Sequence, residues 1–209
     1  MILKKEKLVG FTIVELLIVI VVIAILATIT VVAYEGISVK ARNASTLHAI
    51  KTYEKALKSY ASQHDAYPDF WGSVCLGEGY LDRNNDSLGD CGAEDYPALE
   101  STAFNASLRT IVSSLPPVST KSISAPGGNI GWVGAFIMRW DDITFNGHTA
   151  PYTIAYILEG SAQQCGHGAT METIPGQNWP TTRTSTTGYS WTDSRSTVCH
   201  ISLPNPSQL

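Results

Sequence analysis

The chain has little charge of either sign. Only 15% of its 209 residues are Asp, Glu, Lys or Arg, and the formal net charge is -4. A disordered chain combines low hydrophobicity with high net charge, so a hydrophobic content of 44% with five Trp argues against disorder. A strongly basic nucleic-acid module is disfavoured as well, because its affinity comes largely from cationic contacts to phosphate.

Catalytic motifs are also missing. The sequence has no Gly-x-Ser-x-Gly elbow, no His-Glu-x-x-His pair and no glycine-rich phosphate loop. Its five histidines are scattered along the chain. One pair of adjacent carboxylates, Asp141 and Asp142, favours a strand-ending turn, because neighbouring strand residues point to opposite faces. The sequence therefore predicts a protein that is not an enzyme.

One long apolar run stands out against this background. Between residues 11 and 33 the only charged side chain is Glu15. As a helix, this run would be about 34 Å long, and the hydrocarbon core of a bilayer is about 30 Å thick. Lys4, Lys5 and Lys7 precede it and favour a cytoplasmic location for that flank. The run is therefore predicted to span a membrane.

The start of the apolar run carries a specific motif. A secretory signal peptide has its small-residue cleavage site after the apolar region, whereas here the small residue, Gly10, comes before it. A resemblance to the class III signal of type IV prepilins and pseudopilins lies in the residues Gly10-Phe11-Thr12-Ile13-Val14-Glu15. This resemblance implies cleavage between Gly10 and Phe11 by a prepilin peptidase, followed by methylation of the new amino terminus on Phe11.

Glu15 is an unusual residue for a plain membrane anchor. A carboxylate inside a spanning helix costs about 2.5 to 3.5 kcal/mol on insertion scales, so its presence indicates a function. In the first turn of the cleaved helix the macrodipole would offset part of that cost. The family resemblance implies that Glu15 meets the terminal amine of a neighbouring subunit during filament assembly. The alternative is a simple signal anchor in which Glu15 reaches the lipid headgroups.

The same resemblance divides the chain into three parts. Residues 1–10 are a leader peptide, residues 11–34 a transmembrane and polymerisation stem, and residues 35–209 a globular head. Within the head, apolar residues at intervals of three or four predict that the helix continues to near His64, before Pro68. The predicted buried stripe consists of Ile37, Ala41, Ala44, Leu47, Ile50, Tyr53, Leu57 and Tyr60.

The rest of the head combines a short helix with strands. Residues 69–99 are predicted to be an irregular connection, and a helix over residues 101–115 is predicted to stop at two prolines. Aromatic and aliphatic runs over 132–140, 151–158 and 197–203 predict strands. The expected fold class is α+β and type IV pilin-like, with a long N-terminal helix packed on a small antiparallel sheet and with a C-terminal disulfide loop.

Basic residues recur on another face of the predicted helix. Lys51, Lys55 and Lys58 share this face, and Glu54 lies beside them. The stripe could attract DNA, but charges at helical spacing more often form a solvated or subunit-facing surface. We favour the second interpretation and predict no specific nucleic-acid partner.

The four cysteines allow three disulfide pairings. We predict Cys75 with Cys91 and Cys165 with Cys199, because each pair brackets one local loop and the head is expected outside the cytoplasm. The second pair resembles the C-terminal disulfide loop of many pilins. The alternative is a zinc site that uses Cys165 and Cys199 together with neighbouring histidines.

The first disulfide loop contains a pattern of oxygen-bearing residues. Carboxylates, an amide and a backbone carbonyl at alternate positions are what calcium needs from a short loop. The predicted calcium ligands are Asp82, Asn84, Asp86, the Leu88 carbonyl and Asp90. The alternative is a turn rich in Asp and Asn without metal, since these residues favour turns.

Three functions are consistent with these features. The first is a structural subunit of a type IV pilus, which inserts in the inner membrane as a prepilin and polymerises with copies of itself into an extracellular filament for adhesion, motility or DNA uptake. Its partners would be the prepilin peptidase and the inner-membrane assembly platform. The alternatives are a pseudopilin of a type II secretion system and a minor tip pilin that binds a surface ligand, for which Trp179 and Trp191 beside the Ser/Thr-rich residues 181–197 are candidates.

Overall fold

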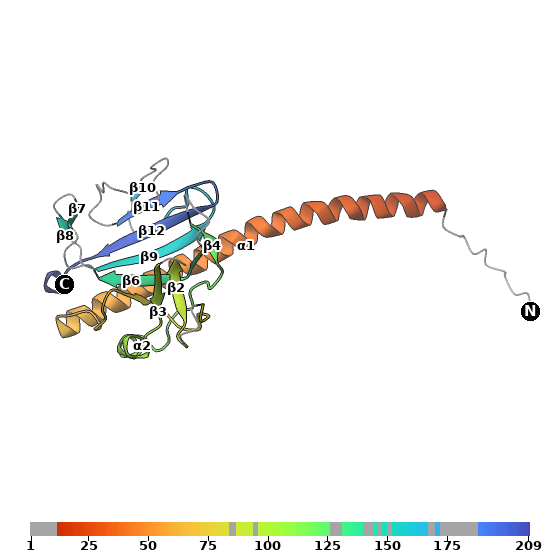
Figure 1. Cartoon of the computed structure of the whole chain (residues 1–209). Helices are drawn as coiled ribbons and strands as arrows, with labels where there is room; N and C mark the ends of the chain where they lie inside the picture. Colours follow the sequence, from red (N-terminus) through yellow and green to blue (C-terminus); the bar gives the residue numbers. More distant parts are fainter. Residues whose placement is uncertain are drawn as a thin grey trace, which may run out of the picture. The chain divides into compact units, whose positions relative to one another are not determined.

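A computed structural model describes residues 12–83, 87–93, 96–125, 131–139, 144–145, 148–149, 152–166, 170–171 and 188–209. The chain divides into two compact units, Met1–Lys40 and Ala41–Leu209. The first helix, α1 (Ile13–His64), supplies the described part of the first unit and continues into the second (Figure 1). We call residues 12–40 the stem and residues 41–209 the head.

The stem presents apolar side chains on all sides of the helix. From Ile13 to Ile29 the large aliphatic side chains are about half exposed or more, and Ile13 is 85% exposed. Thr28 and Thr30 donate their hydroxyl protons to backbone carbonyls three or four residues earlier, so the helix satisfies its own polar groups. Among the described residues, α1 is the one helix long and apolar enough to cross a membrane.

In the head, α1 becomes amphipathic and ends where the sequence predicts. The helix stops at His64, and Asp65 takes a left-handed φ of 53° ahead of Pro68. Ile50, Tyr53 and Leu57 are fully buried.

The prediction of a buried stripe is wrong for its first residues. Ile37, Ala41 and Ala44 are exposed, whereas Asn43 and Thr46 are buried instead. A search for apolar periodicity misses this stretch, because polar side chains dock the first turns of the head helix.

A ten-stranded sheet forms the centre of the head, and its strands lie mostly antiparallel (Figure 1). Its order is β10 (Thr170–Met171), β11 (Gly188–Thr192), β12 (Ser196–Leu203), β9 (Tyr152–Glu159), β6 (Ala135–Arg139), β1 (Ser73–Cys75), β3 (Tyr96–Leu99), β2 (Asp90–Ala93), β5 (Gly131–Val133) and β4 (Ile123–Ser124). The β1–β3 and β10–β11 pairs are parallel. A separate hairpin pairs β7 (Thr144–Phe145) with β8 (His148–Thr149). The sheet is thus larger than the small antiparallel sheet predicted from sequence.

The centre of the sheet is β9, which pairs along its length with β12 and for five residues with β6. Ile154 lies opposite Ile137 on one side and Ile201 on the other. These three residues join the core under α1. Alternate positions, such as Ala155 and Ile157, belong to a second apolar cluster, as expected where successive strand residues face opposite sides.

A glycine separates β5 from β6, whereas the sequence predicts one strand over 132–140. Gly134 has a left-handed φ of 65°, and a Cβ built there would lie 2.3 Å from the ring of Tyr80. The Tyr80 hydroxyl donates to the Leu76 carbonyl over 2.8 Å. The bend at Gly134 therefore makes room for a buried tyrosine and sends β5 to pair with β2 while β6 pairs with β1.

Two other predictions about the head need correction. The connection over 69–99 is not irregular, because it contains β1, β2 and β3, which are too short to show an alternating pattern. The second helix, α2 (Thr102–Arg109), begins after the N-cap Ser101, close to the predicted start, but ends before residue 115. After Arg109 the backbone closes three-residue turns, with Thr110 N–H donating to the Ser107 carbonyl. A final short helix, η1 (Pro206–Gln208), ends the chain.

Candidate functional site

The stem helix begins with a reciprocal cap between Thr12 and Glu15. The Glu15 N–H donates to the Thr12 hydroxyl oxygen over 3.2 Å, and Glu15 Oε2 accepts from both the Thr12 N–H and the Thr12 hydroxyl at 2.8 Å. This is a capping box, in which a Thr and a Glu three residues later satisfy each other's backbone amides. The signature of this cap, Thr-x-x-Glu, is present in the sequence, so the residues alone could have revealed it.

The cap positions the Glu15 carboxylate at the positive end of the helix, where negative charge is stabilised by the macrodipole. Within the described residues only Oε2 accepts hydrogen bonds, so Oε1 can still accept from a cationic partner. Gly10 and Phe11 lie outside the described residues. The assembly role of Glu15 and the processing of Gly10 and Phe11 therefore stay predictions.

Both disulfides have the predicted pairing. Cys75 in β1 bonds Cys91 in β2, and Cys165 bonds Cys199 in β12. The chain has no free cysteine. Because both thiols of the second pair are used in the bond, the alternative zinc site lacks its thiolate ligands.

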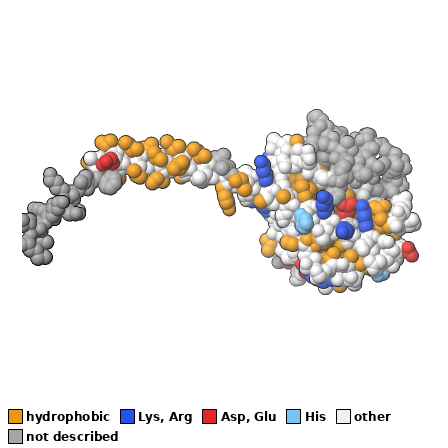
Figure 2. Space-filling model, turned by 180° about the vertical axis from the view of Figure 1, so that it is seen from behind, with side chains coloured by type: hydrophobic (Ala, Val, Ile, Leu, Met, Phe, Trp, Pro, Cys, Tyr) orange, Lys and Arg blue, Asp and Glu red, His pale blue; other side chains and the backbone are white. Residues whose placement is uncertain are grey.

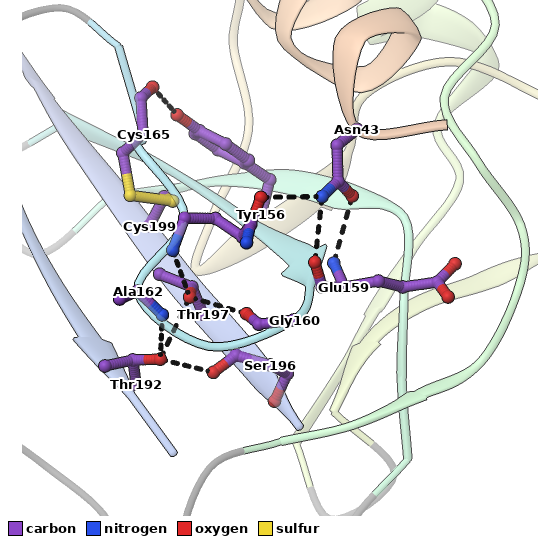
Figure 3. The surroundings of a disulfide bond; sticks show 11 residues. Asn43, Tyr156, Glu159, Gly160, Ala162, Cys165, Thr192, Ser196, Thr197 and Cys199 are labelled. Atoms are coloured by element: carbon purple, nitrogen blue, oxygen red, sulfur yellow. Dashed lines mark hydrogen bonds between the residues drawn. A yellow bond between two sulfur atoms is a disulfide. The ribbon is translucent and has the colours of Figure 1, made fainter. Parts of the chain in front are cut away.

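Near the Cys165–Cys199 disulfide, Asn43 fastens α1 to the end of β9 (Figure 3). Its side-chain amide donates to the Glu159 carbonyl over 2.8 Å, and its side-chain oxygen accepts from the Glu159 N–H over 3.0 Å. Asn43 is buried. A carboxamide paired with both backbone groups of one residue does what a neighbouring strand would do, so α1 takes the place of a strand at this point.

The Glu159 side chain adds an ionic contact to this junction. Arg42 donates to both carboxylate oxygens, at 2.6 and 3.0 Å, and Lys121 donates to Oε2 over 2.8 Å. The bidentate hydrogen bonds from Arg42, together with Lys121, hold the pKa of the Glu159 carboxyl below its ordinary value, against the opposing effect of burial. We call Arg42, Asn43 and Glu159 the helix clamp.

The loop after β9 is held by two threonines of neighbouring strands (Figure 3). The Thr197 hydroxyl donates to the Gly160 carbonyl over 2.9 Å and accepts from the Gln163 N–H over 3.0 Å. The Thr192 hydroxyl accepts from the Ala162 N–H over 2.9 Å. The Tyr156 hydroxyl donates to the Cys165 carbonyl at the end of the loop. The disulfide thus closes a loop that hydrogen bonds already shape.

The predicted calcium loop is described only in part. Asn84 and Asp86 lie outside the described residues, and among the described ones no group of three or more His, Cys, Asp or Glu comes together. Asp82 accepts from the Ser87 N–H over 2.8 Å, and the fully buried Asp90 accepts from the Arg83 N–H over 2.6 Å. These contacts are typical of an Asp-rich turn, and calcium binding stays a prediction.

The two tryptophans proposed for surface binding have different outcomes. Trp179 lies outside the described residues. Trp191 belongs to β11, opposite Val198 of β12, and is not part of a loop. Its place in a strand weakens the case for a loop that binds a surface ligand.

Comparison with known proteins gives one informative match. The type IV major pilin protein PilA of Myxococcus xanthus (strain DK1622) is 26% identical over 137 residues, which cover 59% of this chain and 61% of the relative. The chain is similar to a type IV pilin. No family model matches the sequence. No solved structure matches it either.

The structure agrees with this similarity in its main elements. A type IV pilin-like chain is expected to have a long apolar N-terminal helix, an α+β head and a C-terminal disulfide, and α1, the sheet and the Cys165–Cys199 bond supply them. The chain spans about three fifths of the length of the relative, at 61%. The similarity therefore supports a pilin-like structural role.

Proposed function

We propose that the chain is the structural subunit of a type IV pilus, which polymerises through its apolar stem into an extracellular filament. The observation that carries the proposal is the stem itself, whose aliphatic side chains are exposed all round the helix. A helix with no polar face needs either lipid or copies of itself around it. The similarity to a major pilin supports copies of the chain as the surroundings of the stem in a filament outside the cell.

Burial of the apolar stem and directional contacts contribute to this assembly in different ways. Moving an apolar stem from lipid into a filament gains little, because lipid tails are as apolar as the neighbouring stems. Returning it to water would cost about 1.5 to 3 kcal/mol for each large aliphatic side chain, so an assembled filament does not shed subunits. Directional contacts must therefore select the assembled state, and Glu15 at the capped helix start is the candidate for this contact.

The proposal includes a membrane-bound precursor. The stem holds the prepilin in the inner membrane, a prepilin peptidase cleaves between Gly10 and Phe11, and an assembly platform adds the mature subunit to the filament. No catalytic step is assigned to the chain itself, and its similarity to a structural pilin supports a non-enzymatic role.

Electron microscopy of filaments sheared from cells, combined with mass spectrometry of their subunits, tests the proposal. We expect this chain to be abundant in the filaments, with an N-terminal peptide that begins at methylated Phe11. Recovery in filaments as a trace component would instead indicate a minor pilin. Retention of the processed chain in the cell envelope, with none on sheared filaments, would indicate a pseudopilin and contradict the proposal.

A further inference from the structure

Charge is sharply divided between two neighbouring segments of the chain. Residues 36–58 contain five basic residues and one acid, and residues 59–82 contain four acids and no Lys or Arg. The net charges are therefore +4 and -4, in segments that the structure describes throughout. The remainder of the head has no segment of this kind among its described residues.

The basic segment places three cationic or ionisable side chains on the exposed side of α1. His48, Lys51 and Lys55 are exposed and lie three or four residues apart, so they share one face. We call these three residues the basic face. Figure 2 shows Lys, Arg and His side chains gathered on the side of the head that is turned away from the viewer in Figure 1.

The nearby ion pairs of the described residues leave the basic face out. Lys58 pairs with Glu54 over 2.7 Å, and Arg42 pairs with Glu159. Within the described residues, neither Lys51 nor Lys55 has an ion-pair partner. Two like charges one helical turn apart are destabilising in a helix, so the pair Lys51 and Lys55 does not by itself stabilise an isolated head.

The acidic segment is exposed as well. Asp65, Asp69 and Asp82 lie at the surface, while Glu78 pairs with Arg109. Asp65 follows Lys55 by ten residues on or just past the same helix, which is about 15 Å of axial rise. An ion pair requires about 4 Å, so the two charged groups cannot meet within one chain.

We propose that the basic face of one copy docks against the acidic segment of a second copy, so that Lys51 and Lys55 meet Asp65 and Asp69 of the neighbouring head. Stems inserted in one membrane in the same direction are parallel. A shift of about 15 Å along parallel helices then brings Asp65 of one copy level with Lys55 of the next. The contact joins different patches of identical chains, which is the kind of interface that builds open filaments.

Two features favour a second copy over an anionic polymer or a lipid surface. The whole chain is acidic, with a net charge of -4. The acidic segment follows the basic segment in the same head, and its negative charge would repel phosphate groups that approach this part of the molecule. The same acids are the complementary half of a contact between copies. The inference rests on the proposed function, because it needs a filament of this chain.

Zero-length cross-linking of intact filaments with a carbodiimide tests the contact directly. The reagent joins an amine to a carboxylate only when they are in ion-pair contact. Filaments grown from mixed isotope-labelled and unlabelled subunits separate links between copies from links within one. We expect Lys51 or Lys55 joined to Asp65 or Asp69 of another copy. Links from both lysines to other segments only would overturn the proposal.

Charge reversal provides a second test. We expect K51E/K55E to lower filament yield at least about tenfold at physiological salt, where exposed charges are screened over about 8 Å. The matched control K51R/K55R keeps the charge and should stay within about twofold of the unaltered chain. Adding D69K to K51E/K55E should restore filaments, because it returns an opposite charge to the contact. Equal amounts of oxidised chain in the membrane show that each variant folds.

The outcomes separate this inference from the proposed function. Filaments of the unaltered chain support the proposed function whatever the variants do. Normal filament yield from K51E/K55E would overturn the docking inference alone. Loss of binding to double-stranded DNA or to anionic phospholipid vesicles by K51E/K55E, with normal filaments, would assign the basic face to that partner and also overturn it.

Discussion

The stem and the head use the same residue types in opposite ways. In the stem, Ile13 is 85% exposed and its aliphatic neighbours point outward in every direction, whereas in the head Ile154 is fully buried between a helix and two strands. The apolar side chains therefore lie where the surroundings of each segment favour them. In the proposed function, the stem is surrounded by lipid or by copies of itself, whereas the surface of the head faces water.

The hydrogen bonds of polar side chains also differ between the stem and the head. In the stem, Thr12 and Glu15 cap the helix reciprocally, and Thr28 donates to a carbonyl one turn away, so these hydrogen bonds are local. In the head, Asn43 bonds Glu159, which is 116 residues later in the sequence. Changes in the stem should therefore alter assembly without altering the stability of the head. Changes in the helix clamp or the disulfides should do the reverse.

The largest effect is expected at Glu15. Glu15→Ala removes both the helix cap and the proposed partner of the neighbouring amine, so filaments should be absent while the thermal unfolding of the head is unchanged. Glu35→Ala, an exposed acid on the same helix, serves as the control and should keep its filaments. Electron microscopy and a thermal melt of the detergent-solubilised chain measure the two effects. Normal filaments from Glu15→Ala would refute the assigned role.

The disulfides should show the converse behaviour. Replacing Cys165 and Cys199 by Ser opens a loop with a sequence separation of 34, and replacing Cys75 and Cys91 opens one of 16. Loop-closure entropy gives losses of about 4 and about 3 kcal/mol respectively. Denaturant unfolding of the oxidised and variant chains measures both losses. A smaller loss for the longer loop would contradict this order.

The helix clamp should contribute less than a disulfide. Asn43→Ala leaves the Glu159 N–H and carbonyl without their side-chain partner in a buried place, which should lower the free energy of unfolding by about 1 to 3 kcal/mol. Ser45→Ala, an exposed neighbour on α1, is the control and should change it by less than about 0.5 kcal/mol. Equal unfolding curves for the two variants would contradict the assignment of Asn43 to the docking of α1.

The ion pair in the clamp should make head stability depend on pH. The folded state lowers the pKa of Glu159 below its ordinary value of 4.5, so the carboxylate stabilises the head at and above that pH. This contribution should disappear as the pH falls through the lowered value. Unfolding free energies of the unaltered chain and of Glu159→Gln, compared between about pH 3 and 7, should therefore converge at the acid end. A constant difference across this range would contradict the prediction.

Calcium is expected to have the smallest effect, confined to the loop between Asp82 and Asp90. If the loop binds calcium, the melting temperature of the chain should rise with the ion and fall again with chelator, because a ligand that binds only the folded state stabilises it. Asp82→Asn should reduce that response. A melting temperature that neither calcium nor chelator changes would favour the alternative, a turn rich in Asp and Asn without metal.

The sequence predicted those features that depend on local patterns. The helix end at His64 follows from Pro68, and both disulfides join the cysteines that bracket one local loop. It could not reveal Asn43, because a buried carboxamide looks like any surface residue until its distant backbone partner is placed. Strands β1 to β3 were missed for a related reason. Some of their partners are distant in the sequence, such as β6 for β1, and three or four residues carry too little alternation to predict a strand.

The helix clamp has a mechanical consequence. In the proposed filament, a load applied along a subunit would travel through α1 and enter the head at Arg42 and Asn43, where the head unit begins. These residues pass it to the end of β9, a strand bonded to neighbours on both sides. Peeling α1 from the sheet would then require the carboxamide pair and the guanidinium pair to break together. The junction that docks the helix is thus also the place where the head would resist being pulled apart.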